Sequence, residues 1–76
     1  MARNTELWEA IVRGDAKTTP VLVRKDLDAD IAASDILSES MIPAMRHIGD
    51  QFAKNEVYVP QMLIAARAMN AGLALI

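Results

Sequence analysis

A stripe of large apolar residues at helical spacing is the strongest structural signal in this chain. It repeats at intervals of four, four, three and four residues through Leu37, Met41, Met45 (or Ala44), Ile48 and Phe52. These intervals place the side chains on one face of an α-helix. No stretch of the sequence sustains the alternation of apolar and polar residues expected of a half-buried strand. The sequence therefore predicts an all-α fold.

Breaks in the apolar pattern divide the 76 residues into four predicted helices, at approximately 5–13, 20–29, 34–54 and 60–76. Asn4 or Thr5 is a suitable N-cap for the first helix, because either side-chain oxygen can accept an unpaired backbone N–H. Gly14 supplies the left-handed residue that commonly ends a helix. The apolar residues predicted to face inward from this helix are Leu7, Trp8, Ile11 and Val12. Four such amphipathic helices predict a four-helix bundle.

The start of the second helix is open between two alternatives. Thr19 and Pro20 suit the cap and the first helical position, since proline has no N–H to lose there. Asp15 is a competing cap one turn earlier. Val23 and Leu27 form the apolar pair of this helix in either case.

Two residues of the third predicted helix are poor helix formers. Pro43 removes one hydrogen bond and crowds the preceding turn, which predicts a kink without a break. Gly49 costs about 1 kcal/mol relative to alanine, and we expect close approach of a neighbouring helix to compensate. In the fourth helix, small residues form one face and predict a second close approach: Ala65, Ala68 and Gly72.

Composition restricts the classes of protein to which the chain can belong. It is 53% apolar, carries a net charge of −2 and contains no cysteine, which excludes disulfides and argues against a nucleic-acid binder. Residues 57–76 have the length of a membrane span, but Pro60, Gln61, Arg67 and Asn70 argue against one. We expect a cytoplasmic protein without nucleic-acid or membrane partners. The apolar end AGLALI, which has no polar tail, indicates a fragment of a longer chain.

The sequence offers few residues for chemistry. His47 is the only histidine, and a solvated or capping role is a better interpretation than a metal ligand. The acidic residues of positions 26–35 lack the glycine and terminal glutamate of a calcium loop, which favours a solvated face. Ser34, Ser38 and Ser40 have no base partner, and the three glycines stand apart, so no phosphate loop is present. No catalysis is expected from this chain alone.

The predicted turn between the third and fourth helices is unusually apolar. Its residues Val57, Tyr58 and Val59 are three consecutive large apolar side chains where polar residues normally lie. A turn of this kind needs a cover. The methionines of the two flanking helices are more typical of core filling than of a binding surface.

The run MIPAMRHIGDQFAKNEVYVPQMLIAARAM, residues 41–69, resembles the helical cap of cobalamin-binding domains. Such caps occur in cobalamin-dependent methionine synthase and in the small corrinoid proteins of methyltransferase systems. The residues that carry the resemblance are Pro43, Met45, Gly49, Phe52, Pro60, Ala65, Ala66 and Met69. The match is dense in the second half of the chain and loose in the first.

The resemblance implies a fold, a cofactor and a site. The family's four-helix bundle precedes a Rossmann-like domain that holds the corrin, and it shields the upper face of methylcobalamin. Phe52, Val59 and Met62 stand at the positions that make this cover, so they are the candidate cofactor-binding residues. An apolar lid would protect the cobalt-bound methyl group from water and would swing aside for partner methyltransferases. No catalytic or metal-ligating residue is implied within this chain.

The chain departs from the family pattern in two places. Asp30 stands where relatives often have glycine, although aspartate tolerates a left-handed conformation. The Asp-x-His-x-x-Gly motif that supplies the lower axial ligand is absent, and His47 does not inherit that role. The chain is therefore expected to cap cobalamin without retaining it.

Three interpretations stay open. The first is the cap of a corrinoid protein that carries methyl groups between two methyltransferases, in a methylotrophic or acetogenic demethylation pathway. The second is the cap of a cobalamin- or light-sensing regulator. The third is a helical interaction module that pairs with itself, and self-association into a homodimer is expected of the exposed lid face in either setting.

Overall fold

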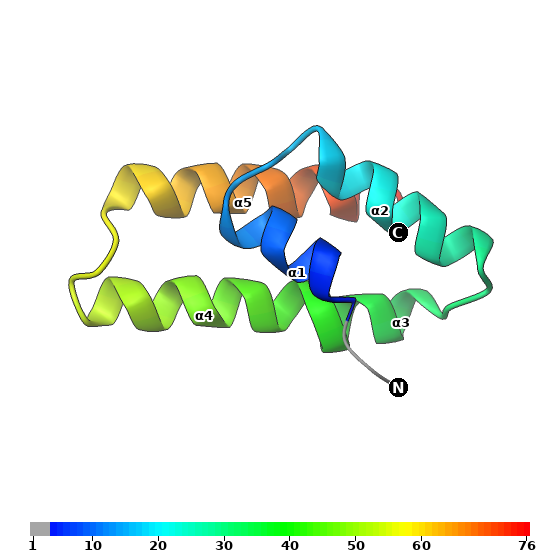
Figure 1. The fold of residues 1–76 in the computed structure, drawn as a ribbon, viewed down its shortest axis with the longest axis horizontal. Helices are drawn as coiled ribbons and strands as arrows, with labels where there is room; N and C mark the ends of the chain where they lie inside the picture. The colour runs from blue at the N-terminus through cyan, green and yellow to red at the C-terminus, as the bar shows by residue number, and fades with distance from the viewer. Residues whose placement is uncertain (1–3) are drawn as a thin grey trace.

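The computed structural model describes residues 4–76 as helices joined by short turns (Figure 1). The elements are α1 (Thr5–Val12), α2 (Thr18–Asp28), α3 (Ala33–Ile36), a π-helical segment (Leu37–Met41), α4 (Ile42–Ala53) and α5 (Val59–Leu73). Since α3, the π-helical segment and α4 follow without interruption, they form one long helix. The described chain is thus a bundle of four helices without strands, which confirms the predicted all-α fold.

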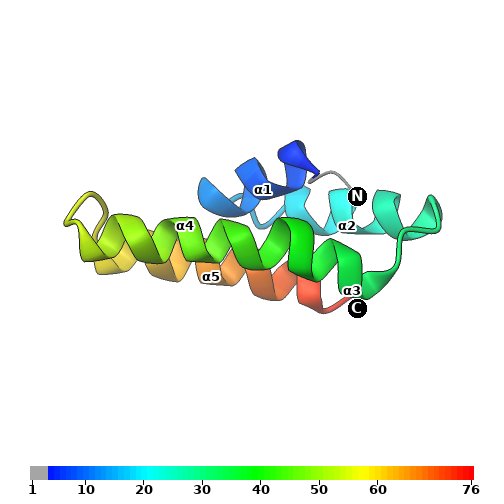
Figure 2. The ribbon, with the colours of Figure 1, turned by 90° about the horizontal axis from the view of Figure 1, so that it is seen from below.

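The helices lie in two layers. Figures 1 and 2 show α4 and α5 running antiparallel beside each other, with α1 and α2 across one face of that pair. Contacts join α1 to α4 and α2 to α5, which holds the two layers together. No element of residues 4–76 covers the opposite face of the α4–α5 pair (Figure 2).

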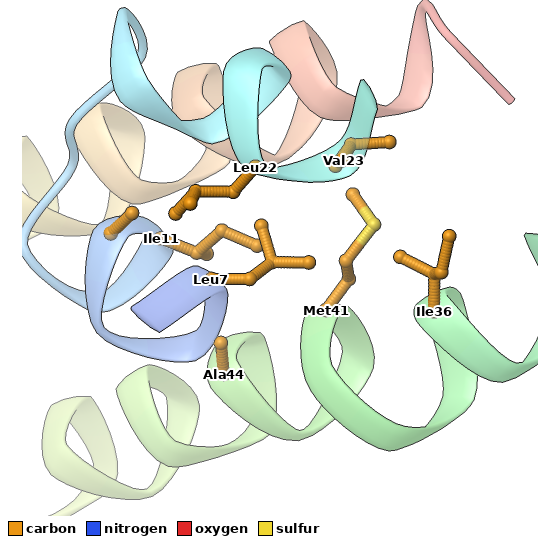
Figure 3. Packing of buried hydrophobic residues seen from close by; sticks show 8 residues of the cluster. Leu7, Ile11, Leu22, Val23, Ile36, Met41 and Ala44 are labelled. Atoms are coloured by element: carbon orange, nitrogen blue, oxygen red, sulfur yellow. The ribbon is translucent and has the colours of Figure 1, made fainter. Parts of the chain in front are cut away.

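The core lies where α1 and α2 meet the long helix (Figure 3). Its buried members are Leu7, Ala10, Ile11, Leu22, Val23, Ile36, Met41 and Ala44. Met41 is fully buried, which confirms that this methionine fills the core. Trp8, Val12 and Leu27 pack half-buried against the cluster, as the apolar pattern predicted.

The small residues of α5 allow the expected close packing. Ala65, Ala68 and Gly72 are all buried. A Cβ atom added at Gly72 would lie 2.8 Å from Cε of Met41 and 3.0 Å from Cγ2 of Thr19. Real Cβ atoms do not approach other heavy atoms so closely. The prediction that this face brings a partner close is confirmed.

The residues on either side of α1 behave as predicted. Asn4 is the N-cap, and its side-chain oxygen accepts the backbone N–H of Leu7 at 3.2 Å. Its amide nitrogen also donates to both carboxylate oxygens of Asp26, at 3.0 and 2.9 Å. The backbone N–H of Asn4 donates to the buried hydroxyl of Ser40 at 2.9 Å. Gly14 follows the helix with φ +78°, the left-handed value expected of it.

The second helix begins at Thr18 and Lys17 is its N-cap residue, so a start at Pro20 is wrong and the competing cap Asp15 lies two residues before the observed one. Oδ1 of Asp15 accepts the backbone N–H of Thr18 at 3.0 Å. Hydrogen bonds from Thr18, first through its side chain and then through its backbone, lower the pKa of Asp15 from 3.8 to about 2. The side chain of Arg13 also donates to Asp15, at 3.2 Å.

Pro43 does not break the long helix, as predicted, but the adjustment takes the form of a π-helical segment. The backbone N–H of Ile42 donates to the carbonyl oxygen of Leu37, five residues earlier. A proline ring clashes with the carbonyl group four residues before it. The wider π-helical turn ends at Met41, two residues before Pro43; such turns are rare and occur mostly as single insertions within α-helices.

Three further expectations are settled by the backbone. Asp30 adopts φ +63°, which confirms that aspartate keeps the left-handed turn. The fourth helix ends at Leu73, so its predicted continuation to residue 76 is wrong. The predicted packing of a neighbouring helix against Gly49 is also wrong, because an added Cβ would meet nothing within 4 Å. Within residues 4–76 no helix has both the length and the apolar content to cross a membrane.

Candidate functional site

The candidate site lies where α4 ends and α5 begins. Helix α4 ends at Ala53 because Asn55 takes a left-handed conformation, with φ +61°. Asparagine tolerates this region better than most residues, since its short side chain bonds locally. The N–H of Asn55 donates to the carbonyl oxygen of Phe52 at 3.0 Å, and that of Glu56 to Gln51 at 2.8 Å. These bonds close the helix end and turn the chain back on itself.

Helix α5 starts with its own stabilising contacts. Tyr58 precedes it in an extended conformation, which lets the chain enter the helix from the turn. The N–H of Tyr58 donates to Oε1 of Gln61 at 2.7 Å, and Pro60 occupies the first turn. A proline there loses no hydrogen bond that the helix would otherwise make. The turn is therefore held by bonds to the backbone, and its apolar side chains are left for other contacts.

The three predicted cofactor-binding residues are partly or largely exposed. Phe52 is 41% exposed and Val59 is 53% exposed, while Met62 is half-buried. Val59 and Met62 are three residues apart in the first turns of α5, so they lie on one side of that helix. Because α4 and α5 are antiparallel neighbours, the last turn of α4 lies beside these first turns (Figure 1). The structure thus brings the three residues to the same end of the helix pair.

Two exposed residues that the sequence analysis did not single out as site residues lie at the same end. Tyr58 is 73% exposed and Leu63 is 64% exposed. Leu63 follows Val59 by four residues, so helical spacing alone could have placed it beside that residue. We refer to Phe52, Tyr58, Val59, Met62 and Leu63 as the lid patch.

The apolar turn divides its side chains between two directions. Tyr58 and Val59 are exposed, whereas Val57 is half-buried and lines a small cavity of about 160 Å³. The other residues lining this cavity are Val12, Arg13, Ile48, Gln51, Gln61 and Ile64. The lid patch is therefore a surface, and the cavity is a separate, partly open hollow between the end of α1 and the α4–α5 pair.

The lid patch offers apolar contact and no acid–base chemistry. Its members are Phe, Tyr, Val, Met and Leu, and the charged residues of the adjoining turn, Lys54 and Glu56, are exposed. A surface of this kind can cover a flat apolar group and exclude water from it. It is suited to shielding a reactive centre.

The other titratable residues that the sequence analysis considered lie elsewhere. His47 is half-buried against Trp8, with ring centroids 4.9 Å apart, so it is packed and not simply solvated. Asp26 is held by Asn4, while Asp28, Asp30 and Asp35 are exposed. In the part of the chain that the structure describes, no three His, Cys, Asp or Glu residues are grouped as metal ligands. Ser34 and Ser38 are exposed, and Ser40 is buried beneath Asn4.

Comparison with known proteins identifies relatives of the whole chain. The chain is 34% identical over 77 aligned residues to monomethylamine corrinoid protein 2 of Methanosarcina acetivorans, covering 96% of this chain and 36% of that protein. It is 29% identical over 68 residues to the trimethylamine corrinoid protein of Methanosarcina barkeri, covering 90% of this chain and 31% of that protein. The chain therefore spans about a third of the length of these relatives.

A solved structure and a family model agree with these relatives. The monomethylamine corrinoid protein of Methanosarcina barkeri superposes with a TM-score of 0.89 and 30% identity, covering 92% of this chain and 33% of that one. The model of the family described as B12 binding domain matches residues 4–76. The family model covers the whole described helical bundle, so the chain belongs to the B12 binding domain family.

Proposed function

We propose that this chain is the cap module of a corrinoid methyl-carrier protein, and that its lid patch shields the upper face of methylcobalamin during transfer between methyltransferases. The observation that carries the proposal is the partly to largely exposed apolar surface of the lid patch, at the turn between α4 and α5. The family match over residues 4–76 supports cobalamin as the group that this surface covers.

The residues present fit that group. Bound cobalamin would carry the methyl group on its cobalt, and this chain would contribute shape and exclusion of water. Phe52 and Val59 present large apolar side chains to solvent, which costs free energy until they are covered. A cover that must open for partner proteins needs a contact of modest size. Phe52, at 41% exposed, and Val59, at 53%, meet that need, because neither is part of the buried core and their removal from the corrin leaves the core intact.

The partners follow from the same proposal. A Rossmann-like cobalamin domain would supply the corrin's main contacts and its lower ligand, and two methyltransferases would exchange the methyl group. Two relatives are a monomethylamine and a trimethylamine corrinoid protein, which supports a methylamine as the methyl donor of the parent protein. Retention of cobalamin by residues 1–76 alone is not expected, because these residues provide only one side of its site.

A chimera tests the proposal. The chain would replace the matching segment of the Methanosarcina barkeri monomethylamine corrinoid protein, and the chimera would be loaded with methylcobalamin. We expect Phe52→Ala and Val59→Ala to raise the rate of light-driven loss of the methyl group several-fold, as followed by absorption spectroscopy. Val21→Ala is the matched control, because Val21 is also an exposed valine, at 63%, but lies on α2. Equal rates in all three variants would contradict the proposal.

Self-association is a second candidate function, favoured by the exposure of Tyr58 and Leu63. Two copies could cover each other's lid patches through a two-fold contact. Sedimentation velocity of the chain over a hundredfold range of concentration tests this. A rise in mean mass that Leu63→Glu abolishes would support it, and a monomer at all concentrations would refute it.

A further inference from the structure

Gly49 lies in the interior of α4, where glycine has no conformational purpose. Its backbone is helical, and an alanine would stabilise the helix. The usual reason for an interior glycine is close packing against a neighbouring element. Here a Cβ atom built on Gly49 would meet nothing within 4 Å, in contrast to Gly72, where it would lie 2.8 Å from Met41. No contact within residues 4–76 therefore explains why this position is a glycine.

The residues that share a side of α4 with Gly49 indicate which surface a partner would contact. It follows Met45 by four residues and precedes Phe52 by three, so the three share one side of the helix. Both flanking side chains are apolar; Met45 is half-buried and packs against the core cluster, and Phe52 is 41% exposed. Ile42, seven residues before Gly49 on the same side, is 40% exposed. Helices α1 and α2 lie across one face of the α4–α5 pair, and no element of residues 4–76 covers the opposite face (Figure 2).

Gly49 is thus a notch in an apolar strip that ends at the lid patch. Gly49 is half-buried, and the strip carries apolar side chains before it, at Ile42 and Met45, and after it, at Phe52. A flat, rigid group lying on this strip could approach the backbone of α4 at Gly49 more closely than at any position with a side chain. A flexible peptide partner would need no such notch, because its own side chains could adjust to a methyl group.

We propose that Gly49 is a positioning residue at which bound cobalamin approaches the backbone of α4. This inference rests on the proposed function, since it assigns the occupant of the strip from the family match over residues 4–76. A Cβ at this position would hold the macrocycle away from the helix and would loosen the contact of Phe52 with it. The glycine is maintained for the complex at the expense of the stability of the chain alone.

The proposal predicts that Gly49→Ala stabilises the chain alone but weakens its binding of cobalamin. In the chain alone, Gly49→Ala enters open space and gains helix propensity, so the ratio of folded to unfolded protein rises about fivefold. In contact with cobalamin, the same methyl group overpacks the interface and weakens binding roughly tenfold. Asp50→Ala is the matched control. It also improves helix propensity, but Asp50 is exposed and is rotated about 100° around α4 from Gly49.

The experiment uses the whole chain in two measurements. Urea denaturation followed by circular dichroism gives the stability of Gly49→Ala, Asp50→Ala and the unmodified protein. The 15N-labelled proteins are then titrated with methylcobalamin up to millimolar concentration, because the chain alone is expected to contact the cofactor weakly without retaining it. Amide chemical shifts report this contact and its strength. We expect both variants to be stabilised, and the response at the lid patch to weaken in Gly49→Ala but not in Asp50→Ala. Phe52→Ala is included as a test of the lid patch itself.

The outcomes separate the two proposals. If Phe52→Ala weakens the cobalamin response and Gly49→Ala leaves it unchanged, the role of Gly49 is refuted and the proposed function stands. If Gly49→Ala destabilises the chain, the glycine serves an internal contact and the inference is likewise refuted. If methylcobalamin shifts no amide of the lid patch in the unmodified chain at millimolar concentration, the proposed contact itself fails.

Discussion

Removing the side chain of Asn4 should cost a large part of the stability of this bundle. Asn4→Ala removes the N-cap of α1, which is worth about 1 kcal/mol in proteins. It also removes the amide that donates to both oxygens of Asp26, at 3.0 and 2.9 Å. Hydrogen bonds to charged groups contribute about 1.5–3 kcal/mol, and the lower value applies because Asp26 is only half-buried.

The expected loss in the free energy of unfolding is therefore about 2.5 kcal/mol. A 76-residue domain has roughly 4–11 kcal/mol in total, so the loss is a substantial fraction. Urea denaturation of the chain, followed by circular dichroism at 222 nm, measures it directly. In a thermal scan it would appear as a fall in Tm of roughly 10–20 °C.

A double-mutant cycle with Asp26→Ala separates the two contributions. The single variant Asp26→Ala keeps the cap and should lose about 1.5 kcal/mol, and the coupling energy of the pair should be similar. Thr5→Ala is the control on the same turn, since Thr5 is exposed, and it should change stability by less than about 0.5 kcal/mol. Additive losses in the double variant would show that Asn4 does not stabilise the fold through Asp26, and the reasoning would be refuted.

Two further predictions concern packing and pH. Gly72→Ala should lower the free energy of unfolding by up to about 2 kcal/mol, because crowding of Met41 and Thr19 costs about 1–3 kcal/mol and the gain in helix propensity returns about 1 kcal/mol; a gain of stability in urea denaturation would contradict this packing. The lowered pKa of Asp15 contributes stability that is fully present above about pH 4 and is lost as the pH falls towards 2. Denaturation at a series of pH values should show this loss in the unmodified chain and a shallower one in Asp15→Asn, whereas identical slopes would refute the assignment.

Features controlled by local sequence could be predicted. Asn4 caps α1, Gly14 and Asp30 take left-handed conformations, and the buried part of the long helix follows the stripe of apolar residues. Each of these depends on interactions within a few residues, for which side-chain type is decisive. The same local reasoning placed small residues of α5 against the core, since an apolar helix with one alanine-rich face packs closely on that face.

Features that depend on competition between local and distant interactions could not be predicted. Two alternative caps were predicted for α2, Asp15 and Thr19, and the observed N-cap Lys17 lies between them, while Asp15 accepts the N–H of Thr18. The sequence shows the conflict at Pro43, but not that the long helix answers it with a π-helical segment. The last residues of the chain keep their apolar character, and α5 nevertheless ends at Leu73.

The candidate site was predictable in a different sense, because its residues conflict with the folding of the chain alone. A stripe whose middle residues, Met41 and Ile48, are buried continues to Phe52, which is 41% exposed, and an apolar turn leaves Tyr58 and Val59 in solvent. Gly49 weakens its helix without allowing any contact within residues 4–76. Sequences fold well when every local choice agrees with the fold, and departures concentrate at functional sites. Phe52, Val59 and Gly49 are such departures. Gly49 and Phe52 lie on α4 and Val59 lies on α5, the two helices that form the uncovered face. A single partner on that face would account for all of them, which is why a variant that stabilises the chain while weakening cobalamin contact is the sharpest test of what this bundle does.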